Sequence, residues 1–107
     1  MSMNMFDIFI AYVSWGDDGK MRPVLILEQQ ETVVFVFNIT THYENKSEMV
    51  RAKYFKINDW QISGLDKQSY VDTNVIRDLP PKALDDKSAI GKLTESDIKR
   101  LTEFLSL

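Results

Sequence analysis

An arginine and a pair of threonines stand beside apolar runs of this chain, where their side chains can meet. Arg22 comes directly before the run at residues 23–27, and Thr40 and Thr41 follow a second run that ends at Ile39. A guanidinium group can bind a phosphate through two hydrogen bonds, and a hydroxyl can donate another to a phosphate oxygen. These residues predict a polar, phosphate-binding site at one end of a small β-sheet.

Two neighbouring residue types extend this chemistry. His42, the one histidine, can exchange protons near neutral pH, and Asp17 can accept a proton or order a loop over a substrate.

Each of these residues also has an ordinary structural explanation. Arg22 can pair with Asp17 or Asp18 and close the turn before it, which composition alone favours. Adjacent aspartates between glycines usually form a solvated turn, and threonine is common at strand ends. A single histidine in a loop, such as His42, is more often simply exposed. The residue types are therefore compatible with both interpretations, a catalytic site and an ordinary turn.

Composition limits the class of protein. With 107 residues the chain is expected to form one domain over residues 1–107, and its 44% apolar and 27% charged residues are typical of a globular fold. The chain has no cysteine, which excludes disulfides and thiol nucleophiles. The formal charge of -3 argues against long-range capture of nucleic acid, so any RNA contact must be local.

Targeting and metal-binding signals are missing from the sequence. The first five residues carry no basic charge, and no apolar run approaches the roughly 18 residues that cross a bilayer. We expect a soluble, cytoplasmic protein that does not associate with membranes. Neither a metal-ligand spacing nor a phosphate-cradling glycine motif is present, so catalysis is expected to need no metal or cofactor.

Basic and aromatic residues in the second half can contact nucleic acid. Residues 42–56 contain two acidic residues against the basic residues Lys46, Arg51, Lys53 and Lys56, which permits a basic patch. A solvated strand face explains this segment equally well. Aromatic side chains that can stack unpaired bases are Tyr43, Tyr54, Phe55, Trp60 and Tyr70, although most are expected to build the core.

Hydrophobic patterning predicts a mainly β fold. Residues 6–13 form a strand, and residues 14–20 form a flexible charged loop. Nearly continuous apolar runs at 24–27 and 32–39 predict two buried strands at the centre of the sheet. A half-exposed strand is expected over residues 49–57.

The last segments complete the predicted fold. A short helical or turn segment over residues 58–65, capped by Asn58 or Asp59 and stopped by Gly64, is followed by a strand over 69–76. Residues 94–105 predict an amphipathic helix that begins at a variant of the capping box and packs on the sheet. The capping residues are Thr94 and Asp97, and the apolar face contains Ile98, Leu101 and Leu105 with Phe104 beside it. We therefore expect a small, strongly curved antiparallel sheet or barrel closed by a C-terminal helix.

In their order along the chain, several short segments resemble the PemK-like branch of the MazF/PemK toxin family. They are the strand start at Asp7-Ile8, the run from Arg22 to Leu27, Asn38-Ile39-Thr40, Asp59-Trp60 with Gly64-Leu65, Lys67 and Ser69-Tyr70-Val71, and the closing Ile90-Gly91-Lys92-Leu93-Thr94 with Asp97. The resemblance covers nearly the whole chain. It implies an SH3-like β-barrel and a homodimer, for which Phe104 and Leu107 at the chain end are candidate contacts.

The resemblance also implies a function. Such proteins are toxins of type II toxin-antitoxin systems, metal-independent endoribonucleases that cleave single-stranded RNA at short sequence motifs and are neutralised by a cognate antitoxin. In that mechanism the RNA 2′-hydroxyl attacks the adjacent phosphate. The protein needs only to position the strand, move protons and stabilise the charge that develops on the phosphate.

The resemblance assigns roles position by position. Arg22 matches the catalytic arginine of the family, and Thr40 matches its catalytic threonine or serine. Asp17 lies near an acidic loop residue that some members use, and His42 is a further catalytic candidate. The residues expected to bind RNA are Lys20, Thr41, Lys46, Arg51 and Lys53.

Three positions depart from the family pattern. Phe6 stands where many members have glycine, Gln68 replaces a usual proline, and Asn74 stands where some members carry a catalytic aspartate. The last departure leaves the general base open, with His42 or Asp72 as substitutes.

Two other functions fit the same fold. One is a non-catalytic gyrase poison resembling CcdB, and the other is a binding module that has lost activity. RNA cleavage that depends on Arg22 and Thr40 separates the ribonuclease from both.

Overall fold

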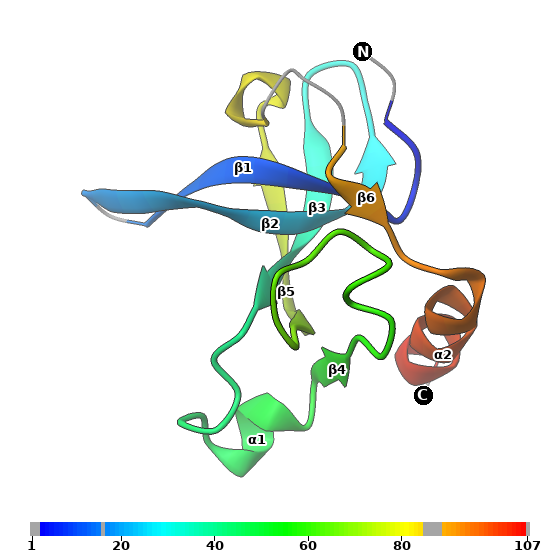
Figure 1. Cartoon of the computed structure of the whole chain (residues 1–107). Helices are drawn as coiled ribbons and strands as arrows, with labels where there is room; N and C mark the ends of the chain where they lie inside the picture. Colours follow the sequence, from blue (N-terminus) through cyan, green and yellow to red (C-terminus); the bar gives the residue numbers. More distant parts are fainter. Residues whose placement is uncertain (1–2, 16, 85–88, 107) are drawn as a thin grey trace.

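A single curled antiparallel sheet organises the computed structural model, which describes residues 3–15, 17–84 and 89–106 (Figure 1). The strands are β1 (Asp7–Trp15), β2 (Asp18–Gln29), β3 (Val34–Thr40), β4 (Tyr54–Lys56), β5 (Tyr70–Leu79) and β6 (Gly91–Lys92). The helical elements are α1 (Glu48–Arg51), the 3-10 helix η1 (Pro81–Ala83) and α2 (Glu95–Leu105). The strand order is β4-β5-β3-β2-β1-β6, with β2 and β3 at the centre as the sequence predicts.

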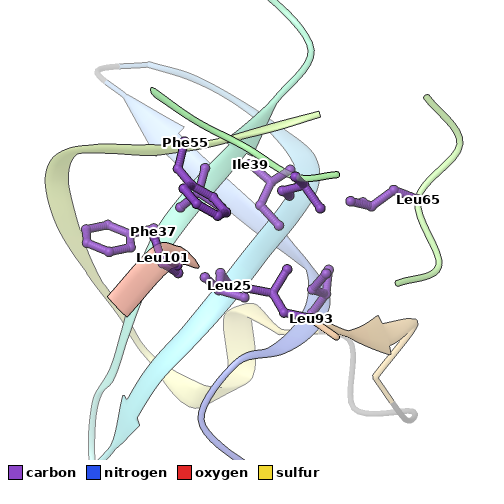
Figure 2. Packing of buried hydrophobic residues seen from close by; sticks show 10 residues of the cluster. Leu25, Phe37, Ile39, Phe55, Leu65, Leu93 and Leu101 are labelled. Carbon is purple, nitrogen blue, oxygen red and sulfur yellow. The ribbon is translucent and has the colours of Figure 1, made fainter. Parts of the chain in front are cut away.

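The central strands are buried on both faces of the sheet. Successive side chains of a strand point to opposite faces, so an uninterrupted apolar run is stable only where both faces are covered. One cluster, which includes α2, contains Ile8, Leu25, Phe37, Ile39, Phe55, Ile57, Leu65, Val71, Leu93 and Leu101 (Figure 2). The other contains Phe9, Ala11, Val13, Val24, Ile26, Val34, Val36, Leu79 and Leu84. This confirms the expected curved sheet with a C-terminal helix packed on it.

The sheet divides at Pro23. Pairing between β2 and β3 ends at Val24 and Asn38, whereas pairing between β1 and β2 continues as far as Trp15 and Asp18. Proline has no N–H group, so β2 cannot donate a backbone hydrogen bond at residue 23. Beyond this point β1 and β2 leave the sheet as a two-stranded arm, while β3 continues beside β5 (Figure 1).

The predicted loop over residues 14–20 is wrong, because most of this segment belongs to the arm. Ser14 pairs with Gly19, and Trp15 pairs with Asp18. The ring of Tyr12 lies over Gly19, where a Cβ atom would come within 2.6 Å of a ring carbon. A residue without a side chain therefore lets the tyrosine lie across the hairpin.

The predicted strand over residues 49–57 is also wrong, since a helical turn occupies its first half. Ser47 caps α1 by accepting a hydrogen bond from the backbone N–H of Val50 at 3.3 Å, and Glu48 lies in the first turn. A serine cap followed by an acidic residue favours a helix over an extended strand. The strand β4 begins only at Tyr54.

The buried carboxylate of Asp97 docks α2 onto the preceding turn segment. Thr94 caps the helix as predicted and accepts a hydrogen bond from the Asp97 N–H at 3.3 Å. The Asp97 side chain accepts from the backbone N–H groups of Asn58 and Asp59, at 3.3 Å and 2.8 Å, and forms an ion pair with Arg100 at 2.7 Å. The segment over residues 58–65 is a turn, as expected, but Asp97 rather than Asn58 or Asp59 provides its cap.

Across the described ranges, no helix is both long enough and apolar enough to span a membrane.

We predict that Asp97→Asn lowers the free energy of unfolding by about 2 kcal/mol, because a neutral amide replaces a carboxylate that accepts charge-assisted hydrogen bonds. Urea unfolding followed by circular dichroism measures this loss. Glu95→Gln changes an exposed carboxylate in the same helical turn and should alter stability by less than about 0.5 kcal/mol. Equal losses in the two variants would contradict a special role for Asp97.

Candidate active site

The division of the sheet opens a cleft of about 210 Å³ between β2 and the end of β3, which we call the first cleft. Its lining combines charged, hydroxyl and apolar side chains. These are Lys20, Met21, Arg22, Pro23, Ile39, Thr40, Thr41, His42 and Ser69.

A second cleft of about 280 Å³ shares Arg22, Thr40 and His42 with the first. The remaining lining residues are Val13, Asn38, Lys46, Tyr54, Asp72 and Arg77. The three shared side chains therefore form the wall between the clefts, accessible from both.

Strand register explains why Arg22 and Thr40 meet. Val24 pairs with Asn38, and the same antiparallel register extended by two residues places Arg22 opposite Thr40. The two strands no longer pair there, so both side chains line open space instead of a continuous ladder. The sequence-predicted residues Arg22, Thr40 and His42 are thus brought together.

Thr40 also fixes the start of the loop that carries His42. Its Oγ1 atom accepts a hydrogen bond from the backbone N–H of His42 at 3.0 Å. This bond uses an oxygen lone pair, so the hydroxyl hydrogen remains available for an acceptor in the cleft.

Tyr54 is a buried phenol between opposite charges. Burial raises the pKa of Tyr54 above 10.0, the negative charge of Asp72 raises it further, and the positive charge of Arg22 lowers it. The phenol is therefore neutral at physiological pH and can donate a hydrogen bond.

Asn74 holds Asp72 and does not line either cleft. Its backbone N–H and its Nδ2 group both donate to Oδ1 of Asp72, at 2.9 Å and 2.8 Å, and Nδ2 also donates to the carbonyl of Val50 at 3.1 Å. Asn74 thus orients a nearby carboxylate. Both substitutes for the general base, His42 and Asp72, line the second cleft.

Solved structures include close likenesses to this fold. Comparisons with protein-family models and with curated proteins find no match. The Mycobacterium tuberculosis toxin MazF-mt6 superposes with a TM-score of 0.71 and 28% identity, over 94% of this chain and 92% of that one. The chain is therefore similar to MazF toxins in fold and, at 28% identity, in sequence. A second solved structure, an Mtb toxin, has a TM-score of 0.62 and 28% identity over 79% of this chain and 89% of that one.

The other predicted site residues are divided between the clefts and more distant positions. Lys20 and Thr41 line the first cleft, and Lys46 lines the second. Asp17 lies in the turn at the tip of the arm, roughly 17 Å along β2 from Arg22 at the usual rise of a strand.

Two basic residues of the predicted RNA-binding set lie elsewhere. The Arg51 guanidinium lies over the ring of Tyr43, 5.3 Å from its centroid. Lys53 lines a separate cavity beside the end of α2.

The predicted base-stacking aromatics mostly pack against one another or against the core. Tyr43 and Tyr70 are stacked with their ring centroids 4.5 Å apart. Tyr54 and Phe55 are buried, and Trp60 packs partly buried on the core. Packing against one another and against the core therefore accounts for the positions of these aromatic side chains.

Sequence patterns did not single out Arg77, which lines the second cleft. In the pairing of β5 with β3, Asp72 lies opposite Asn38, whereas Arg77 lies opposite Val36. This shift forms a bulge in β5 that re-aims the following side chains. No residue in the bulge gives a clear sequence signal for it.

Within the described parts of the chain, no cluster of three or more histidine, cysteine, aspartate or glutamate residues is arranged to hold a metal ion.

We predict that alkaline pH destabilises the wild type more than Tyr54→Phe. The pKa of Tyr54 is higher in the folded chain than the unfolded value of 10.0, so its contribution is complete below pH 10 and is lost as pH rises through the folded pKa. Urea unfolding at about pH 8 and about pH 11 measures the difference.

The exposed Tyr12 provides a matched control, because Tyr12→Phe removes a hydroxyl that is not buried. The Tyr12 variant should keep the alkaline loss of the wild type. Identical pH profiles for the wild type and Tyr54→Phe would contradict the prediction.

Proposed function

We propose that the protein is the toxin of a type II toxin-antitoxin system and a metal-independent endoribonuclease that cleaves single-stranded RNA, including mRNA, at short sequence motifs. The observation that carries this proposal is the shared wall of Arg22, Thr40 and His42 between two clefts. The likeness to MazF-mt6 over most of both chains supports it.

The reaction requires only groups that the clefts contain. The RNA 2′-oxygen attacks the adjacent phosphorus while its proton passes to a base, and the bond from phosphorus to the 5′-oxygen breaks. The products are a 2′,3′-cyclic phosphate and a 5′-hydroxyl, with one proton returned to the leaving oxygen. Positioning and charge stabilisation supply most of the acceleration in phosphoryl transfer of this kind.

Three side chains have distinct roles in the proposed reaction. The Arg22 guanidinium binds the reacting phosphate and stabilises the charge that develops on its oxygens. The free hydroxyl hydrogen of Thr40 donates to the same phosphate. His42 moves the proton, because it lines both clefts and therefore reaches the phosphate from either side.

Neighbouring groups bind the rest of the strand. Lys20 and Thr41 contact RNA in the first cleft, and Lys46 contacts it in the second. Arg51 and Lys53 contribute only at a distance. A cognate antitoxin is proposed to lay an extended acidic segment across the same clefts and block cleavage, in the cytoplasm where its target RNA is found.

A homodimer is proposed from the family resemblance and from exposed apolar surface. Phe104 is not a free contact, because it is half-buried and packs edge-on against Phe55 with 5.6 Å between ring centroids, and Leu107 lies outside the described residues. Val75, Ile76 and Leu105 are exposed, and the last two line a cavity of about 620 Å³. These residues replace Leu107 as candidate contacts.

The ribonuclease is tested with long single-stranded RNA in EDTA, with breaks mapped by primer extension. We expect cuts at selected sites that fall by about 100-fold or more in Arg22→Ala and Thr40→Ala, because each variant loses a donor to the charged phosphate. Thr40→Ser retains the hydroxyl and should retain most of the rate.

A substitution far from the clefts controls for a general loss of folding. Lys99→Ala, on the exposed face of α2, should cut like the wild type. Absence of cuts, or cuts that survive both alanine variants, would refute the ribonuclease and favour a binding module or gyrase poison.

The dimer is tested by analytical ultracentrifugation at micromolar concentration. We expect the wild type to sediment as a dimer and Ile76→Glu or Leu105→Glu to sediment as a monomer, because burial of a carboxylate at an apolar contact is unfavourable. Ile62→Glu alters an exposed isoleucine outside this surface and should remain dimeric. A wild type that sediments as a monomer would contradict the proposed homodimer.

A further inference from the structure

A third cleft of about 460 Å³ adjoins the second, between the arm and the end of β5. It shares Val13 and Arg77 with the second cleft, just as the second shares its wall with the first. The other lining residues are Tyr12, Ser14, Asp78, Leu79, Pro80, Lys82 and Ala83. The three clefts therefore adjoin one another, from β2 and the end of β3 to β1 and the end of β5.

Arg77, at the junction of the second and third clefts, has an unused hydrogen-bond donor. Its Nε atom is buried and has no hydrogen-bond partner within the part of the chain that the structure describes. A buried polar group without a partner is unfavourable, and more so when it carries charge. The planar donors of arginine match the oxygens of a phosphate, so an anion in the cleft would supply the missing acceptor.

The third cleft also has a second cation. Lys82 and the exposed Asp78 belong to the same lining as Arg77. Cations that line a groove and bind the phosphate backbone are characteristic of surfaces for single-stranded nucleic acid.

We propose that a bound RNA strand continues from the first two clefts into the third, where Arg77 binds a phosphate next to the reacting one. This inference rests on the proposed ribonuclease function. It extends the contact beyond the nucleotides that react.

Binding is tested without cleavage, using fluorescent 2′-O-methyl RNA of random sequence and about ten nucleotides. This probe lacks the attacking hydroxyl, and fluorescence anisotropy at several salt concentrations gives the dissociation constant. Arg77→Met should bind about tenfold more weakly, and the slope of log K against log salt should fall by about 0.7, as for one lost phosphate contact.

Thermal unfolding separates this role from a structural one. Arg77→Met removes an unpartnered buried donor and keeps the aliphatic stem, so its Tm should equal or exceed that of the wild type. Lys99→Met, on α2 and away from the clefts, should change neither Tm nor affinity. A lower Tm for Arg77→Met together with unchanged affinity and slope would overturn the proposal, as would a wild type that does not bind the probe.

The cleavage assay distinguishes the two proposals. If binding depends on Arg77 but the wild type does not cut RNA, only the ribonuclease is refuted. If the wild type cuts RNA through Arg22 and Thr40 while Arg77→Met binds and cuts normally, only the extended contact in the third cleft is refuted.

Discussion

The missing N–H group of Pro23 sets the shape on which the candidate site depends. β2 lies at the centre of the sheet, where a continuous ladder would join it to β1 on one side and β3 on the other. Because β2 cannot donate at Pro23, pairing with β3 ends at Val24 and the two strands separate. The opening exposes Arg22 on one strand and Thr40 on the other. Backbone chemistry thus creates the cleft, and side chains give it polarity.

The rest of the chain packs against the sheet that contains this opening. Apolar residues of β2 and β3 are buried on both faces, so the sheet must curl and be covered by α2 on one face and by η1 with Leu84 on the other. Asp97 joins α2 to the turn segment through backbone N–H groups as well as through Arg100.

The charge of the residues that line the clefts differs in sign from the net charge of the chain. The chain carries a formal charge of -3, yet Lys20, Arg22 and Lys46 line two adjoining clefts.

The sequence predicted those features that depend on local pattern. The uninterrupted apolar runs required buried central strands, and Thr94 with Asp97 marked the start of α2 correctly. The arm was missed because glycine and aspartate suit a loop and a hairpin turn equally well. α1 was missed because Val50 and Tyr54 suggest a strand, whereas the Ser47 cap favours a helical turn. The position of Arg77 depends on a bulge in β5, which local pattern does not specify.

The arm gives the chain a region that can vary at little cost to folding. Past Val24, within the described residues, β2 pairs only with β1, and β1 makes one further bridge, from Ala11 to Leu84. Tyr12, Asp18 and Met21 are exposed there. Substitutions at such positions disturb few core contacts. Natural variation at these exposed positions is therefore tolerated more readily than variation in the two buried clusters of the sheet. A chain built in this way can acquire a new ligand preference by drift on the arm, while selection for stability acts on other residues.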